Sequence, residues 1–244
     1  MTKREPLMEQ SYFDNEVAYL QNESLPKFKA KIQFSEITPA HRSSISHAIF
    51  LRSYQLLITK YSQGETIHNL KLLFPEIVEA LEAYHPEDEG EPLRFNFKRH
   101  IEEYVVPMWL VSLGIIFEIE DELFEKLVNL IGNEGEDLVY EKLVGTRISG
   151  RKQTDKILYP KPYQFLRGAI EAETEHQGKV MTEFLKLWYP SMKQAYWHEC
   201  HKEKEGGGFF GYWAIEAAGV VKAFKIDDAE FREMPYYPKD LIER

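Results

Sequence analysis

The chain has 244 residues, 43% of them hydrophobic and 14% aromatic, which is enough to build the core of one large domain or two small ones. Its formal charge of −10 argues against a nucleic-acid-binding protein, because phosphate binding needs clustered lysine and arginine, and it favours a basic protein partner instead. The single cysteine, Cys200, excludes an internal disulfide and is ordinary in a reducing compartment.

Neither a secretion signal nor a membrane span is expected. The N-terminal sequence MTKREPLMEQ lacks the apolar core of a signal peptide. The longest apolar run, residues 105–117, is too short to cross a bilayer, which needs about 20 residues. We therefore expect a cytoplasmic protein with no membrane partner.

Strand signals are scarce and most segments show helical spacing, so we expect an all-α multi-helix bundle with two packed subdomains. Residues 1–35 show no sustained period and predict an arm with a short helix. A helix follows over 39–62, with Phe50, Tyr54 and Tyr61 along one face. Gly64 ends this helix, as a C-terminal glycine does.

The next segments complete an expected N-terminal helical domain over residues 36–132. Apolar residues recur at steps of three and four over 67–84, where Pro75 either kinks the helix or opens a new one. After an acidic loop at 85–92, a long helix runs through Phe117, and a short helix over 121–131 stops at Gly132.

Residues 133–244 are expected to form a C-terminal helical domain. Short helices are predicted over 137–144, 163–173, 180–188 and 191–204, with 145–162 as an exposed polar loop. The last helix carries a buried stripe, followed by an acidic pair and a Tyr-Tyr-Pro segment (Tyr236, Tyr237, Pro238) that either packs the C-terminus onto the body or forms a partner-binding tip. The stripe consists of Trp213, Ala217, Val220 and Phe224.

Two blocks of the chain resemble a known family. The sequences GYWAIEAAGVVKAF, IDD and YYPKDLI near the C-terminus look like the C-terminal domain of the PoNi family, and RSYQLLITKYSQGETIHNLKLLF at 52–74 is similar to its companion domain. Together the blocks resemble the family over roughly residues 36–244. The resemblance implies an immunity protein that binds and neutralises a PoNe-type bacterial DNase toxin. It also implies a protein that is not an enzyme and needs no cofactor.

Charge is distributed unevenly along the chain. Residues 82–137 hold 15 acidic and 4 basic residues, whereas 142–167 hold seven basic residues and one acid. The acidic segment is either a solvated helix face or a surface complementary to a basic DNA-binding groove. On charge alone, the candidate partner-binding residues are Glu118, Glu120, Asp121, Glu122 and Glu125, with Glu87, Asp88 and Glu89 in the preceding loop.

An alternative class is a helical metalloenzyme of the di-iron carboxylate type, because Glu-x-x-His occurs at Glu65/His68, Glu82/His85 and Glu173/His176. Two of these pairs lie near helix ends, so we expect no metal site. The sequence HECH at 198–201 lacks further ligands at a suitable spacing. An adaptor for an unrelated basic partner is a third possibility, and a homodimer stays open.

Glu216 lies on the apolar face of its helix, where an isolated carboxylate is costly, so it should find a cation or several hydrogen-bond donors. Arg52 likewise interrupts an apolar helix face and is one candidate partner in an internal ion pair. We expect a structural role for both, and for Tyr61, Gly64, Trp213 and Tyr237.

Overall fold

The computed structural model describes residues 2–86, 94–203 and 207–242, and within these ranges the regular elements are all helices. The expected all-α class is confirmed. By their contacts the residues form two units, Met1–Arg94 with Glu199–Gly211, and Phe95–His198 with Tyr212–Arg244. No helix in the described ranges has the length and apolar character needed to span a bilayer.

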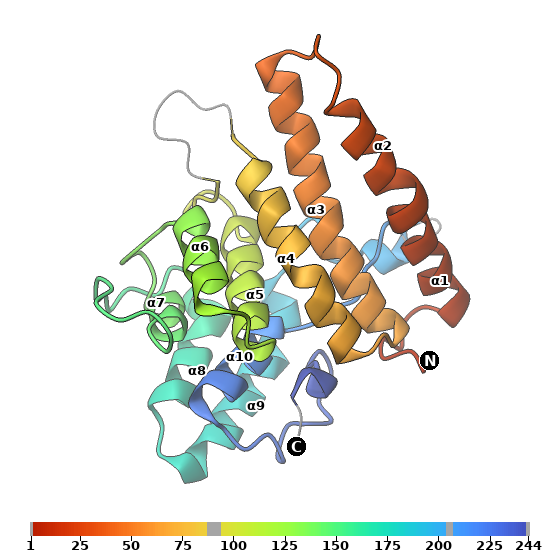
Figure 1. The fold of residues 1–244 in the computed structure, drawn as a ribbon. Coiled ribbons are helices and arrows are strands. Elements are labelled where there is room, and N and C mark those ends of the chain that lie inside the picture. The colour runs from red at the N-terminus through yellow and green to blue at the C-terminus, as the bar shows by residue number, and fades with distance from the viewer. Residues whose placement is uncertain (1, 87–93, 204–206, 243–244) are drawn as a thin grey trace. The chain divides into compact units, whose positions relative to one another are not determined.

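The first unit begins with a nearly continuous helical segment (Figure 1), where the sequence predicted an arm and one short helix. It consists of α1 (Gln10–Tyr19), a π-helical turn (Leu20–Ser24) and α2 (Leu25–Lys31). The prediction missed this helical segment because a π-helical turn shifts the apolar positions, so no single 3.6-residue period persists. Its apolar side packs on α3 through a cluster of Val17, Leu20, Leu25, Ile45, Ile49 and Leu56.

Helices α3 (Pro39–Gln63) and α4 (Ile67–Ala83) pack side by side in the first unit (Figure 1). Threonine side chains at 38 and 66 cap their N-termini. Pro75 lies inside α4 on its exposed side, so the helix continues through it and no new helix opens there. Gly64 ends α3 with φ of 108°, and a Cβ there would collide with the Thr2 carbonyl oxygen. The turn and the approach of the N-terminal segment therefore both require glycine.

The N-terminal segment buries a carboxylate. Glu5 is 3% exposed, and its Oε2 accepts a hydrogen bond of 2.6 Å from the Leu7 N–H. Burial raises the pKa of the Glu5 carboxyl from 4.5 to about 6, against the opposing effect of the Leu7 hydrogen bond. Nearby, Arg4 donates to the carbonyl oxygens of Tyr61 and Glu65 and holds the segment on the end of α3.

We expect Glu5→Gln to increase the free energy of unfolding near neutral pH. A carboxyl whose pKa is raised on folding stabilises the fold at low pH, and this stabilisation is lost as the pH rises from 4.5 through about 6. Glutamine retains a hydrogen-bond acceptor without this loss. Urea unfolding of both proteins at about pH 5 and about pH 7 measures the effect. A difference between the two proteins that does not grow with pH would contradict the prediction.

The second unit is built around two buried helices. Every residue of α5 (Glu102–Ile116) from Tyr104 to Ile116 is buried, and it packs on α10 (Ile215–Phe224), which is buried from Ile215 to Val221. Around them lie α6 (Asp121–Ile131), α7 (Leu138–Val144), α8 (Pro160–Glu171) and α9 (Thr174–Ser191), with α8 packed against α9 (Figure 1).

Several predicted elements differ from the structure. The long helix expected to follow the loop at 85–92 begins at Glu102, and the helix expected over 180–188 extends over Thr174–Ser191. The helix expected over 191–204 is a series of turns with one short 3₁₀ turn at Cys200–Lys202, preceded by Glu199 in the left-handed region. Trp213 precedes α10, in a segment without regular structure, although it is buried as expected. A 3₁₀ turn at Lys239–Leu241 follows near the C-terminus.

The expected division into two domains at Gly132 stays a prediction, because it concerns which parts of the chain fold independently. By contacts, α5 and α6 group with the C-terminal helices, because α5 packs on both α6 and α10.

Candidate functional site

Five candidate carboxylates lie where α5 turns into α6. Glu118, Glu120, Asp121, Glu122 and Glu125 are all exposed. Helix α6 buries one face, consisting of Phe124, Leu127, Val128 and Ile131, and this places the acidic residues on the outer side. The structure thus brings together these five residues, which are close in sequence.

Two of the five carboxylates already have cation partners within the second unit. Glu118 lies 2.7 Å from the Lys222 ammonium, and Asp121 accepts a hydrogen bond from Arg147. The same guanidinium donates to the Ile119 carbonyl oxygen at 2.6 Å and lies 4.4 Å from the Phe124 ring centre. These contacts hold the turn and pair Glu118 and Asp121 with cations of the same unit.

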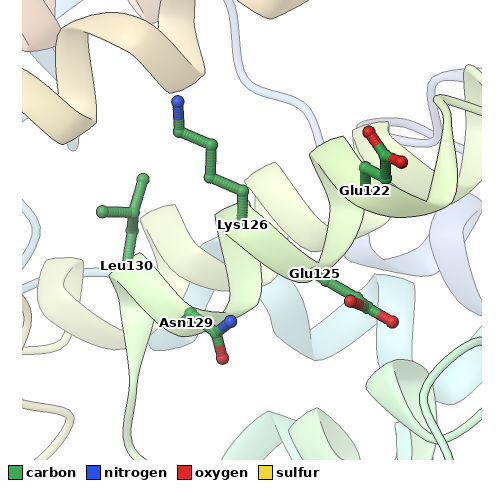
Figure 2. A pocket seen from close by; sticks show the side chains of 5 residues that line it. All are labelled: Glu122, Glu125, Lys126, Asn129 and Leu130. Atoms are coloured by element: carbon green, nitrogen blue, oxygen red, sulfur yellow. The ribbon is translucent and has the colours of Figure 1, made fainter.

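The other three carboxylates, Glu120, Glu122 and Glu125, form no ion pair within the part of the chain that the structure describes. The outer side of α6 also carries a hollow of about 420 Å³, lined by Glu122, Glu125, Lys126, Asn129 and Leu130. In Figure 2 Lys126 and Leu130 extend to one side of the helix, and Glu125 and Asn129 to the other. The acidic candidates in the loop before α5, Glu87, Asp88 and Glu89, lie outside the described residues.

Glu216 is fully buried and is bound by hydrogen-bond donors on three other helices. Trp109 Nε1 of α5 donates to Oε2, while Tyr163 OH of α8 and Trp188 Nε1 of α9 donate to Oε1, each at 2.8 Å. Burial raises the pKa of the Glu216 carboxyl, and these three donors oppose the rise. The carboxylate therefore joins four helices of the second unit.

The suggested ion pair between Glu216 and Arg52 is wrong. Arg52 belongs to the first unit, where its Nε donates to Ser24 Oγ at 2.8 Å and its guanidinium lies 4.7 Å from the Phe28 ring centre. Neutral indole and phenol groups donate hydrogen bonds to Glu216 instead. Several donors in place of a cation were the other arrangement that we expected for a buried carboxylate.

Sequence reasoning missed two further buried carboxylates, Asp137 and Glu141. Asp137 is fully buried, caps α7 through the N–H groups of Val139 and Tyr140, and accepts a hydrogen bond from Tyr104 OH at 3.0 Å. Burial raises the pKa of the Asp137 carboxyl. Its position just before a helix is a capping signal that the sequence did contain. The partner of Glu141, Arg151, lies ten residues further along the chain, and no local pattern identifies it.

The remaining structural candidates are buried or close-packed. Tyr61 is 3% exposed under the Arg4 guanidinium, and Tyr237, also 3% exposed, donates to Asp228 Oδ2 at 3.2 Å. Tyr237 thus packs the C-terminal segment, while Tyr236 stacks on Tyr189 with ring centres 4.9 Å apart. The structural roles assigned to these residues stay predictions until they are tested by mutation.

The described residues contain no group of three or more histidine, cysteine or carboxylate side chains placed to hold a metal ion. Glu65, for example, is 8% exposed and is engaged by the Thr66 N–H and the Asn69 amide. The Glu-x-x-His pairs therefore do not assemble a shared di-iron site within the described ranges.

Comparison with known proteins identifies the fold and the family. The model of "PoNe immunity protein (PoNi), N-terminal" matches residues 4–129, and that of "PoNe immunity proteins (PoNi), C-terminal" matches residues 135–241. No curated protein matches the chain. Among solved structures, protein PA2201 from Pseudomonas aeruginosa has a similar fold. Its TM-score is 0.71 at 17% identity, and the match covers 98% of this chain and 90% of that one.

At that identity the likeness to PA2201 concerns the fold alone. The two family models, by contrast, cover nearly all of the chain between them, including both blocks that carry the sequence resemblance. The chain belongs to the PoNi family of PoNe immunity proteins.

Proposed function

We propose that this immunity protein neutralises a DNase toxin in the cytoplasm by covering the toxin's DNA-binding or active-site surface with the acidic side of α6. Family membership supports the general role, an immunity protein against PoNe nuclease toxins. The observation that carries the specific mechanism is the set of three exposed carboxylates without ion-pair partners among the described residues, Glu120, Glu122 and Glu125.

The chemistry of the target supports this choice of surface. A protein that cleaves DNA presents basic side chains to the phosphates, and carboxylates can occupy the same positions. Because Glu118 and Asp121 are held by Lys222 and Arg147, the three other carboxylates are the ones available to cations of a partner. Their field also accelerates association with a basic protein by steering.

The proposed mechanism is binding and occlusion, which requires neither a cofactor nor catalysis by the immunity protein. A homodimer stays a prediction, as does the absence of nucleic-acid binding. An adaptor for an unrelated basic partner is the competing hypothesis, and capture of the partner separates the two. The tagged chain should retain one nuclease at near-equal stoichiometry and silence its DNase activity when the purified proteins are mixed.

Reversing two charges on α6 tests the proposed surface. We expect Glu122→Lys/Glu125→Lys to slow association with the nuclease captured by the wild-type chain by about tenfold at low salt, and to flatten the dependence of the association rate on salt. The reason is that both carboxylates are exposed and have no ion-pair partner among the described residues. Stopped-flow or surface binding kinetics across a salt series measures both effects.

The matched control is Glu173→Lys/Glu175→Lys. These two residues are also exposed and lie in the same unit, at the start of α9, so the two substitutions change the net charge by the same amount. We expect the control to have a much smaller effect. Equal rates for the α6 variant and the control would remove the acidic side of α6 as the contact surface.

A further inference from the structure

The chain between α9 and α10 contributes to a unit to which neither helix belongs. Both helices lie in the second unit, but Glu199–Gly211, within the stretch that joins them, belongs to the first unit by its contacts. The structure describes residues 199–203 and 207–211 of this segment. By sequence the segment falls inside the match to the C-terminal family model, residues 135–241. The C-terminal half of the chain thus supplies part of the first unit.

Two phenylalanines near the end of this segment are buried in the first unit. Phe209 is 0% exposed and Phe210 is 2% exposed. The ring centre of Phe209 lies 6.1 Å from that of Phe13 and 6.4 Å from that of Tyr12, both in α1. Phe13 is itself fully buried, and rings at these separations are in packing contact. Phe209 therefore packs against the helix that begins the first unit.

Hydrogen bonds from two helices of the first unit hold the backbone of the same two residues. Tyr12 OH of α1 donates to the Phe209 carbonyl oxygen at 2.9 Å, and Ser62 Oγ of α3 donates to the Phe210 carbonyl oxygen at 2.7 Å. Ser62 is fully buried. Buried carbonyl oxygens need donors, and here side chains supply them where no helix or sheet does. The segment is thus attached through its backbone as well as its rings.

Glycines on both sides give the chain the conformations that this insertion needs. Gly208 has φ of 75° and Gly211 has φ of 106°, in the left-handed region that residues with a Cβ rarely adopt. They stand directly before and after the two phenylalanines. The sequence Gly-Phe-Phe-Gly therefore lets the chain turn on either side of a short buried stretch.

Helix α1 depends on this packing because it is short. It has 10 residues, and isolated helices of fewer than about 12–15 residues are marginal in water. Its buried residues are Phe13 and Val17. Val17 lies in the cluster that α3 shares, whereas Phe13 packs on Phe209. Loss of the Phe209 ring leaves a cavity beside Phe13, and the helix has little stability of its own to compensate.

We propose that Gly207–Gly211 is a plug that the C-terminal half of the chain inserts into the first unit, and that α1 stays folded only while the plug is in place. The fold then contains a local opening reaction, in which the plug leaves and α1 unfolds. The second unit stays folded during this opening, because its core is built on α5 and α10. This inference does not depend on which surface binds the toxin.

Hydrogen–deuterium exchange of the full chain, followed by mass spectrometry of its peptides, tests the plug. We expect Phe209→Ala to speed amide exchange in α1 by at least about a hundredfold, and exchange in α5 and α10 by less than about threefold. The control is Phe231→Ala, which removes another fully buried ring, packed on Tyr237 in the second unit. Exchange in α1 should keep its wild-type rate in the control. Equal acceleration of α1 in both variants, or none in Phe209→Ala, would overturn the inference.

Two milder substitutions keep the test open if Phe209→Ala does not fold. Tyr12→Phe and Ser62→Ala each remove one hydrogen bond to the plug and leave its rings in place. We expect each to speed exchange in α1 about tenfold. Ser53→Ala is the matched control, because Ser53 Oγ donates to the Ile49 carbonyl oxygen within α3 itself, and it should change the rate by less than about threefold. Rates in α1 that are the same for all three variants contradict the plug.

Discussion

Replacing Glu216 by leucine lowers the free energy of unfolding of the second unit by about 3–5 kcal/mol. The substitution removes the carboxylate oxygens that accept hydrogen bonds from three buried donors, Trp109 Nε1, Trp188 Nε1 and Tyr163 OH. Each unsatisfied buried donor costs about 1–3 kcal/mol, and the avoided desolvation of the carboxylate offsets part of the total. Because domain stability is about 5–15 kcal/mol, the loss is a large fraction of it.

The measurement is urea unfolding followed by tryptophan fluorescence. All 4 tryptophans, at positions 109, 188, 197 and 213, lie in the second unit, so the signal reports on that unit. The control on the same helix is Lys222→Gln, which removes only an exposed ion pair with Glu118 and should cost less than about 1 kcal/mol. A loss for Glu216→Leu no larger than that of the control would contradict the role of the carboxylate.

Glu216→Gln tests the individual hydrogen bonds to Glu216, because glutamine has nearly the same shape but only one acceptor oxygen. The amide oxygen can replace Oε1 and accept from Tyr163 and Trp188, but the amide nitrogen then faces the Trp109 N–H, and two donors meet. We expect a smaller loss than for leucine, and a favourable coupling between Glu216→Gln and Trp109→Phe in a double-mutant cycle. Additive effects would show that the Trp109 hydrogen bond contributes nothing specific.

The second large effect is expected at Gly219, where α10 packs on α5. A Cβ at this position would lie 2.9 Å from Ser112 Cα and would also collide with Ser112 Oγ and Cβ. Backbone atoms in a buried helix cannot move aside easily, so we expect Gly219→Ala to destabilise the second unit by about 1–3 kcal/mol, although alanine is the better helix former. Thermal or urea unfolding by tryptophan fluorescence measures the change.

Gly178→Ala is the matched control within a helix. Its Cβ would meet the side chain of Glu230, which is exposed and can move away, so this variant should be neutral or slightly more stable. Ser112→Gly should partly restore stability to Gly219→Ala, because it removes two of the colliding atoms. Destabilisation of Gly178→Ala and Gly219→Ala by similar amounts would contradict the steric explanation.

The buried carboxylates show how far the sequence could lead. The apolar neighbours of Glu216 indicated that it is buried and must be satisfied, since the cost of an isolated carboxylate depends only on burial. Its partners could not be read from the sequence, because Trp109, Tyr163 and Trp188 lie 28 to 107 positions away and meet it only when four helices assemble. Arg52 was suggested as the cation partner because it interrupts an apolar helix face, but it packs within the other unit.

For the acidic surface, too, the sequence located the residues, whereas their ion-pair partners became visible only in the structure. Counting charges located the five carboxylates around the start of α6, and their exposure follows from the apolar face that the helix buries. Which of them already have a cation partner depends on Lys222 and Arg147, which come from distant parts of the chain. The loop from Gly145 to Tyr159 looked unconstrained for a related reason, because the carboxylates that bind its backbone N–H groups, Glu134 and Asp137, lie 18 and 21 residues before the groups that they bind.

By itself, then, the sequence determined the all-α class, most helix boundaries after residue 38, the family and the site of greatest negative charge. These properties depend on local spacing, capping and composition, which a linear pattern records. Only the tertiary structure decided the donors around Glu216, the pairing of Glu118 and Asp121, and the order of the connection after α7. Each of these depends on side chains far apart in sequence, and their free energies are set by burial and distance in the folded chain.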